Sequence, residues 1–160
     1  MSFSIRKAIS SDMDGVLSLI KELAVYEKEP DAVMITAQTL RDHGLGEHPL
    51  FTCFVAIDNE KVIGIALVYY RFSTWAGKSL HLEDLIVSQK HRGKGIGLAL
   101  YNQVMLFAHQ NDVKRVEWVV LDWNESAIAF YEKSGVHFLK DWHLVQMDNN
   151  QLSTYVKKLE

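Results

Sequence analysis

A glycine-rich stretch, Arg92-Gly93-Lys94-Gly95-Ile96-Gly97, constrains the fold more than any other feature of the chain. It follows an apolar run from Leu80 to Val87 that has the length of a strand, and it precedes apolar residues at helical spacing from Leu98 to Ala108. Glycines at the start of a helix let backbone N–H groups approach an anion, and the helix dipole favours phosphate there. The order strand, glycine turn, helix therefore predicts an anion-binding turn. The alternative is a turn that only packs the helix against the strand.

The stretch matches neither of two common phosphate motifs. A P-loop requires Gly-Lys-Ser/Thr, but Gly93-Lys94 is followed by Gly95, and a dinucleotide fingerprint requires glycine where Leu98 stands. His91 either contacts the phosphate or is a solvated turn residue. The whole chain has 17 Lys and Arg against 20 Asp and Glu, a net charge of −3. This balance gives no basic surplus, so we expect no nucleic-acid partner.

The other apolar patterns predict an α/β fold, a mixed sheet with helices on both faces. Hairpins come first along the chain and strand–helix–strand units come later. We expect strands at residues 3–5, 51–57, 62–72, 80–87, 116–121 and 142–147. We expect helices at residues 13–24, 36–44, 98–108 and 126–134. With 160 residues and 48% hydrophobic residues, the chain fits a single domain, residues 1–160.

Several classes of protein are excluded by what the sequence lacks. Cys53 is the single cysteine, which excludes an internal disulfide and a zinc cluster built on cysteines. The seven histidines form no ligand-spaced pair, so we predict no metal. No signal-peptide pattern is present, and no apolar run approaches the roughly twenty residues of a membrane-spanning helix. We therefore expect a cytoplasmic protein without a membrane partner.

These motifs resemble the Gcn5-related N-acetyltransferase (GNAT) family. Its signature Gln/Arg-x-x-Gly-x-Gly/Ala is matched by Arg92, Gly95 and Gly97, and its later motif by the segment from Asn124 to Gly135. The resemblance implies acetyl-CoA as cosubstrate and a mixed, mostly antiparallel sheet that is splayed at the acetyl-CoA site. The cofactor-binding residues that it implies are Leu85, Ile86 and Val87 on the pantetheine, with Arg92, Gly93, Lys94, Gly95, Ile96, Gly97, Leu98 and Asn124.

The resemblance extends along nearly the whole chain to the spermidine/spermine and thialysine acetyltransferase branch. The matching segments are Lys21-Glu22-Leu23-Ala24, Gly46-Glu47-His48-Pro49, Trp75-x-Gly77-Lys78, Leu82-Glu83-Asp84 and Asp122-Trp123-Asn124. The branch implies a small cationic amine as substrate and a homodimer. Ser73 stands where the polyamine enzymes carry aspartate, and an acidic pair of theirs is reduced to Lys140-Asp141. These departures favour thialysine, another lysine analogue or a small diamine over a long polyamine.

Two residues are predicted to be catalytic. The resemblance gives Tyr131 the role of acid for the leaving thiolate, and phenol and thiol pKa values lie within about two units of each other. Glu83 lies among apolar strand residues, where a carboxylate is costly unless it is paired or functional, and it is the predicted base. The alternatives are an aromatic residue that packs on the sheet for Tyr131 and an outward-facing carboxylate for Glu83. Cys53, inside an apolar strand, is expected in the core, which favours direct attack over an acetyl-cysteine intermediate.

The predicted amine site combines carboxylates with aromatic rings, which suits ammonium groups. The branch residues that line it are Tyr26, Glu27, Trp75 and Glu83, although Glu27 also fits a solvated helix end. The sequence thus predicts an N-acetyltransferase for a small amine. A protein lysine or N-terminal acetyltransferase and a non-catalytic acyl-CoA-binding module are the alternatives, because a fold alone does not fix a function.

Overall fold

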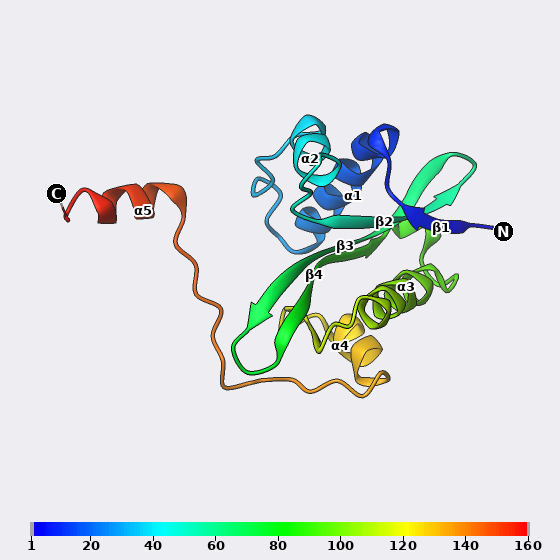
Figure 1. Cartoon of the computed structure of the whole chain (residues 1–160). Helices are drawn as coiled ribbons and strands as arrows, with labels where there is room; N and C mark the ends of the chain where they lie inside the picture. The colour runs from blue at the N-terminus through cyan, green and yellow to red at the C-terminus, as the bar shows by residue number, and fades with distance from the viewer. Residues whose placement is uncertain (1, 160) are drawn as a thin grey trace. The chain divides into compact units, whose positions relative to one another are not determined.

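The structure is a computed structural model that describes residues 2–159 (Figure 1). These residues form two compact units, divided after Val119. The first unit contains a five-stranded sheet in the order β1-β2-β3-β4-β5. Its strands are β1 (Ser4–Lys7), β2 (Thr52–Asp58), β3 (Lys61–Ser73), β4 (Gly77–Val87) and β5 (Arg115–Glu117). The first four pair antiparallel, and β5 pairs parallel to β4. The prediction of a mixed, mostly antiparallel sheet is confirmed.

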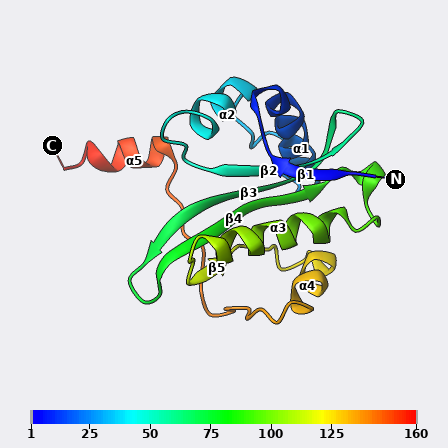
Figure 2. The ribbon, with the colours of Figure 1, turned by 45° about the vertical axis from the view of Figure 1, so that its right-hand side comes forward.

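Helices cover both faces of this sheet (Figures 1 and 2). Helices α1 (Met13–Tyr26) and α2 (Ala37–Gly44) pack on one face, and α3 (Ile96–Gln110) packs on the other. Short 3-10 helices, Ser10–Asp12 and Gln89–His91, precede α1 and α3. Each face buries its own apolar side chains, so both layers are held by hydrophobic contact.

The core beneath α1 is built from alternate residues of the central strands. Met13 and Val16 of α1 are completely buried, and they belong to one cluster with Val55 of β2 and Ile65 of β3. The buried Cys53 belongs to the same cluster. Burial raises the pKa of the Cys53 thiol to about 12. Such a thiol is not a nucleophile near neutral pH, which agrees with its prediction as a core residue.

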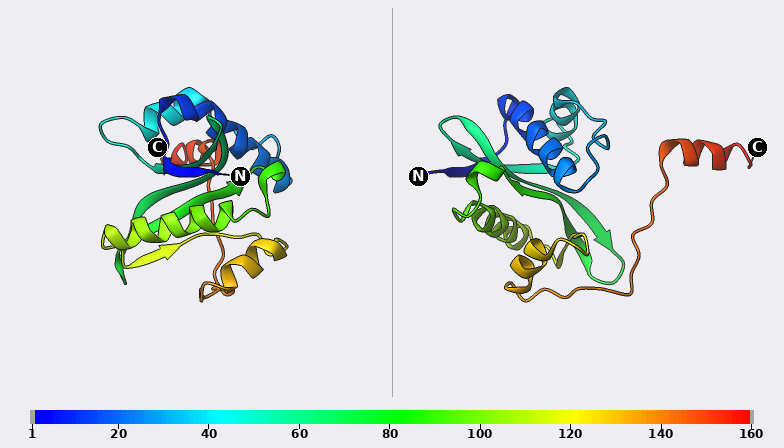
Figure 3. Two further views of the ribbon diagram at one scale, coloured as in Figure 1. Left: turned by 90° about the vertical axis from the view of Figure 1, so that its right-hand side faces the viewer. Right: turned by 180° about the vertical axis from the view of Figure 1, so that it is seen from behind.

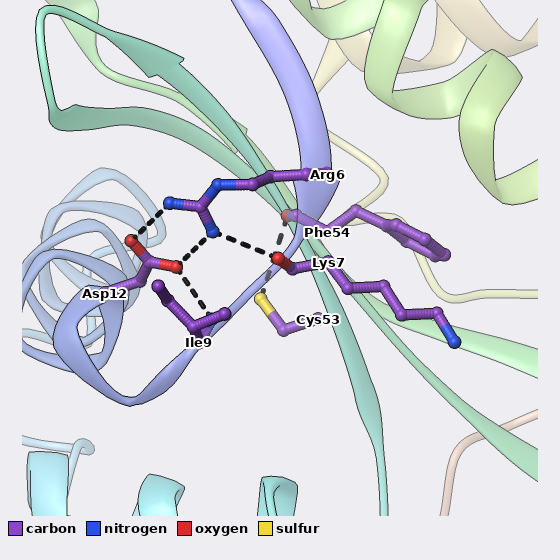
Figure 4. A network of polar contacts seen from close by, with 6 residues as sticks. All are labelled: Arg6, Lys7, Ile9, Asp12, Cys53 and Phe54. Atoms are coloured by element: carbon purple, nitrogen blue, oxygen red, sulfur yellow. Dashed lines mark hydrogen bonds and ion pairs between the residues drawn. The ribbon is translucent and has the colours of Figure 1, made fainter.

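An ion pair joins β1 to the start of α1 (Figure 4). Arg6 donates from both terminal nitrogens to Asp12, at 2.6 and 3.0 Å, and the Ile9 N–H donates to the same carboxylate at 2.7 Å. The Asp12 side chain is only 6% exposed, so its charge is compensated where water cannot solvate it. This pair orients α1, whose last turn contributes to the candidate site.

The opposite face is packed closely by α3. Phe54 of β2 and Phe107 of α3 make an edge-to-face contact with ring centroids 5.4 Å apart. A Cβ on Gly64 of β3 would lie 3.0 Å from Leu100 Cδ1 and 3.2 Å from the Ile86 carbonyl oxygen. Glycine at this position therefore allows the helix to approach the sheet.

The second unit contains α4 (Glu125–Glu132) and α5 (Asn149–Val156). Residues 141–148 between them have neither helix nor strand (Figure 3). The prediction of a strand at 142–147 is wrong. Its alternation of apolar residues fits a strand, but a strand forms only with a partner that accepts its hydrogen bonds. Trp142, Leu144 and Val145 are all more than two-thirds exposed.

Two further differences from the sequence prediction concern the length of strand β5 and the presence of helix α5. Strand β5 covers Arg115–Glu117, not 116–121, and Val119 is 60% exposed, so the apolar run does not stay in the sheet. Helix α5 was not predicted. Asp148 caps it by accepting from the Gln151 N–H at 2.8 Å, while the Asp148 N–H donates to the Gln151 side chain at 2.9 Å. This capping box was a helix signal in the sequence.

Candidate active site

The glycine turn between β4 and α3 has the backbone that an anion site requires. Gly93 and Gly95 have φ angles of +75° and +78°, a region that side chains with a Cβ rarely adopt. A Cβ on either glycine would meet no atom within 4 Å, so the turn faces open space. Gly95 is the N-cap of α3, and no side chain caps the helix in its place. The first N–H groups of α3 therefore remain available to a ligand such as the pyrophosphate of coenzyme A.

Beside this turn, β4 loses its partner on one edge. The parallel pairing with β5 covers only Ser79 to His81, opposite Arg115 to Glu117. From Leu82 to Val87, the ladders of the described residues join β4 only to β3. The splayed sheet expected at the acetyl-CoA site is thus present. The free edge of Leu85, Ile86 and Val87 suits an extended ligand that pairs with backbone groups in the manner of an added strand.

A bulge interrupts the pairing of β4 with β3 at Glu83. Leu82 lies opposite Val68, and Asp84 lies opposite Leu67, so Glu83 is an extra residue without a register partner. The Glu83 side chain is 51% exposed, whereas Leu82 is 2% exposed. Bulges redirect side chains and are common next to active sites. This bulge explains how Glu83 reaches solvent from a strand of buried residues.

Asp84 is the most perturbed carboxylate near the bulge. Burial, and after it the charges of Glu83 and Glu27, raises the pKa of Asp84 to about 6. Burial also raises the pKa of Glu27, the residue that caps the C-terminus of α1. The charges of Glu83 and Glu27, which come from two elements, therefore both act on Asp84. We name Glu27, Glu83 and Asp84 the acidic group; like charges held together favour a bound cation.

A second set of charged side chains extends from Glu83 across the sheet. His81 Nε2 lies 3.5 Å from Glu83 Oε2, and His81 Nδ1 lies 3.5 Å from Arg71 Nη1. Arg71 Nη1 also pairs with Glu117 Oε1 at 2.6 Å, and Arg115 Nε pairs with Glu117 Oε2 at 2.9 Å. Burial lowers the pKa of His81, an effect that Arg71 strengthens and Glu83 opposes. His81 is therefore neutral at pH 7.

Tyr26 and Arg92 connect the end of α1 to the glycine turn. The Arg92 guanidinium lies 5.4 Å from the centroid of the Tyr26 ring, and Arg92 Nε donates to the Val87 carbonyl at 3.0 Å. Lys94 extends from the turn and donates to the Lys90 carbonyl at 3.2 Å. The structure thus brings a predicted amine-site residue, Tyr26, next to a predicted cofactor residue, Arg92.

Trp75 lies at the turn of the β3–β4 hairpin and is 82% exposed. Ser73 shapes this turn, because its Oγ accepts from the N–H groups of Trp75 and Ala76 at 3.2 and 3.1 Å. Between Gly77 and Glu83, β4 extends about 20 Å at the usual rise of a strand. The structure therefore does not bring Trp75 into the acidic group.

The remaining predicted residues belong to the second unit. Asn124 is the N-cap of α4, and its side-chain oxygen accepts from the Ala127 N–H at 3.2 Å. Tyr131, in the last turn of α4, is 8% exposed and contacts the Phe130 ring edge-to-face at 5.2 Å. Gly135 follows with a φ of +76°. The motif from Asn124 to Gly135 thus forms a capped helix that fixes the orientation of Tyr131.

Sequence reasoning missed Asp84, His81 and Arg71 as site residues. Asp84 was visible inside the Leu-Glu-Asp motif, but strand alternation places neighbouring side chains on opposite faces. Only the bulge, which no local pattern announces, puts Glu83 and Asp84 into one group. His81 and Arg71 lack a motif, and their relation depends on the register of β3 against β4, in which His81 pairs with Tyr69.

An open strand edge beside a glycine turn is the arrangement expected of an enzyme that takes an acyl group from coenzyme A. The model of the acetyltransferase (GNAT) family matches residues 16–136, and the chain belongs to this family. It is an N-acetyltransferase with acetyl-CoA as its cosubstrate.

Relatives agree with this family, and a solved structure shares the fold. A thialysine N-epsilon-acetyltransferase from Sus scrofa is 34% identical over 94% of this chain and 95% of its own length. A spermidine/spermine N(1)-acetyltransferase-like protein 1 from Homo sapiens is 34% identical over 94% of this chain, which spans 23% of that protein. The structure of an integron cassette protein from V. cholerae covers 98% of this chain and 99% of its own with a TM-score of 0.78 at 24% identity, which supports the fold.

No helix in residues 2–159 is long and apolar enough to cross a membrane. No three His, Cys, Asp or Glu side chains in this range are grouped so that they could hold a metal ion.

Proposed function

We propose that the chain transfers the acetyl group of acetyl-CoA to the primary amine of a small cationic molecule, a thialysine-like amino acid, a diamine or a polyamine. The acidic group beside the free edge of β4 supports this substrate class most directly. Its carboxylates attract an ammonium group, which would then lie next to the thioester. The relatives named for thialysine and for spermidine/spermine acetylation support it.

The acetyl-CoA site of this proposal follows β4 into the glycine turn. Leu85, Ile86 and Val87 bind the pantetheine through the free strand edge, and the turn from Arg92 to Leu98 binds the pyrophosphate. The open space in front of Gly93 and Gly95 supports this assignment. Asn124 contributes by holding the start of α4.

Bound acetyl-CoA supplies an activated carbonyl that a neutral amine attacks directly. Glu83 is the proposed base: it takes the proton that the substrate ammonium must lose, directly or through water. Tyr131 is the proposed acid and gives its proton to the sulfur of the leaving thiolate. Direct attack is supported by the buried, unreactive Cys53.

Tyr26 and Glu27 line the amine site in this proposal, together with Glu83. Trp75 belongs to the predicted set but lies at the hairpin turn, so we propose that it contacts only the distal end of a longer amine or acts from a second copy in a homodimer.

Exposed apolar side chains at Trp142, Leu144 and Val145 support a dimer that covers them. Size-exclusion chromatography with light scattering measures the mass, and a monomer overturns the dimer. The cytoplasm is the proposed compartment.

The proposed function is tested by thiol release from acetyl-CoA with a panel of amines. The panel contains thialysine, lysine, putrescine, spermidine, spermine and lysine-containing peptides. Turnover with a small amine that exceeds turnover with every peptide supports the proposal. Turnover with peptides alone identifies a protein acetyltransferase, and acetyl-CoA binding without any turnover identifies a binding module.

A further inference from the structure

The charged side chains around Glu83 form two sets, one mainly negative and one mainly positive. On one side lies the acidic group, Glu27, Glu83 and Asp84. On the other side, Arg71 and Arg115 share a single carboxylate, that of Glu117. This second set has two positive charges and one negative charge. A site with an acidic end and a basic end attracts a zwitterion more than it attracts a polycation.

Arg71 has the geometry to bind a second anion. Its Nη1 contacts Glu117 and His81, while the hydrogen bonds of residues 2–159 make no use of its Nη2 or Nε. The side chain is 52% exposed, so these donors are accessible. A guanidinium offers five N–H donors in a planar fork that matches a carboxylate.

The distance between the two ends fits a small amino acid. His81 bridges them, with Nε2 3.5 Å from Glu83 and Nδ1 3.5 Å from Arg71. Two such contacts and one imidazole ring place Arg71 Nη1 at most about 9 Å from Glu83 Oε2, and the other guanidinium donors up to about 2 Å farther. With a hydrogen bond of about 3 Å at each end, an ornithine or lysine spans this distance in a bent conformation. His81 Nδ1 faces a group that only donates, so the neutral ring keeps its proton on Nε2 and adds no charge between the ends.

We propose that Arg71 is a specificity-determining residue that binds the α-carboxylate of an ω-amino acid while the terminal amine of that substrate lies at Glu83. Arg115 pairs with Glu117 and holds this carboxylate in place. Glu117 in turn orients Arg71 through Nη1, so that Nη2 and Nε of Arg71 stay available to the substrate. A second ammonium, as in a diamine of the same length, would lie against Arg71 and be repelled. This inference rests on the proposed function and narrows its substrate class to amino acids with a terminal amine.

The test compares substrates that differ only in the charged groups at one carbon. Putrescine is ornithine without the carboxylate, cadaverine is lysine without it, and 5-aminopentanoate is ornithine without the α-amine. Initial rates of thiol release by the full chain give kcat/KM for each, and NMR of the product identifies the acetylated nitrogen. We expect ornithine to exceed putrescine, and lysine to exceed cadaverine, by at least tenfold. We expect 5-aminopentanoate to exceed putrescine too, with acetylation at the terminal amine.

The variant Arg71→Gln tests the residue itself. We expect the ornithine-to-putrescine ratio to fall at least tenfold, through a higher KM for ornithine, and Arg71→Lys to give an intermediate ratio because it retains the charge without the fork. Arg41→Gln is the matched control: Arg41 is also a paired arginine, bonded to Asp14 on the α1–α2 side, and it lies outside the site. Circular dichroism of all variants verifies folding.

Each outcome decides between the two proposals. A ratio near or below one in the wild type, or a ratio that Arg71→Gln and Arg71→Lys leave unchanged, overturns the inference. If putrescine or spermidine is then still acetylated, the proposed function stands. If no amine releases thiol, the proposed function itself fails.

Discussion

The Glu83 carboxylate and the His81 imidazole lie 3.5 Å apart, Oε2 to Nε2, on the same strand. Their side chains can meet because residues two apart on a strand project from the same face. His81 Nδ1 faces the Arg71 guanidinium, so Nε2 holds the ring proton and presents it to Glu83. A neutral imidazole that offers its N–H to Glu83 thus helps to position the carboxylate, which suits a base that must accept a proton from an ammonium.

The first prediction concerns Glu83. We expect Glu83→Gln to lower kcat with the best amine at least about a hundredfold, because a positioned general base contributes about that much or more. Steady-state thiol release measures it. Glu60→Gln, an exposed glutamate in the β2–β3 turn, is the matched control and retains wild-type kcat. A Glu83→Gln variant that keeps more than a third of kcat would leave Asp84 as the base.

The second prediction concerns Tyr131. We expect Tyr131→Phe to lower kcat at least tenfold, since the ring still packs against Phe130 while the proton for the thiolate is lost. Isothermal titration should give an acetyl-CoA Kd within threefold of wild type. Tyr155→Phe, an exposed tyrosine on α5, serves as control. Unchanged kcat in Tyr131→Phe would remove Tyr131 as the acid.

The fold was largely predictable from sequence, whereas the site was predictable only in part. Apolar periodicity located α1, α3 and the central strands because burial of one face imposes that pattern. The motif residues Glu83 and Arg92 followed from resemblance. Asp84, His81 and Arg71 did not, because their grouping depends on the bulge and on the register between strands, and neither is encoded in a short window.

The third prediction concerns Asp84 and pH. Burial raises the pKa of Asp84 from 3.8 to about 6 in the folded state, so folding favours its protonated form. Its contribution to stability is therefore full below about pH 4 and is lost as pH rises through 6. At about 1.4 kcal/mol per pKa unit, the loss is about 3 kcal/mol. We expect Asp84→Asn to raise the free energy of unfolding at pH 8 by about 2 kcal/mol and to change it little at pH 4.

Urea denaturation at the two pH values measures this effect. Asp31→Asn, an exposed aspartate between α1 and α2, is the control and should leave the free energy of unfolding unchanged at both. An Asp84→Asn variant that is equally destabilised at pH 4 and pH 8 would contradict the buried, protonated carboxyl described for Asp84.

The fourth prediction compares two glycines of the turn. Gly95 has a φ of +78°, where a side chain costs about 1 kcal/mol or more, whereas a Cβ on Gly97 makes an ordinary contact of 3.7 Å with Val87. We expect Gly95→Ala to lower the free energy of unfolding by about 1 kcal/mol and Gly97→Ala to leave it within about 0.5 kcal/mol or to raise it, because alanine is the better helix former. Thermal unfolding measures both. Equal effects would mean that the backbone of Gly95 is not held in this conformation.

The fifth prediction separates direct attack from an acetyl-cysteine intermediate. Burial raises the pKa of the Cys53 thiol to about 12, so only a negligible fraction is thiolate at pH 7. We expect Cys53→Ala to retain kcat within twofold, at a cost in stability of about 1 kcal/mol for the lost core contacts. Initial-rate patterns with both substrates varied should intersect, as for a ternary complex. Parallel lines in the wild type, together with an inactive Cys53→Ala variant that still folds, would establish the covalent route, because only an obligatory acetyl-cysteine releases free coenzyme A before the amine binds.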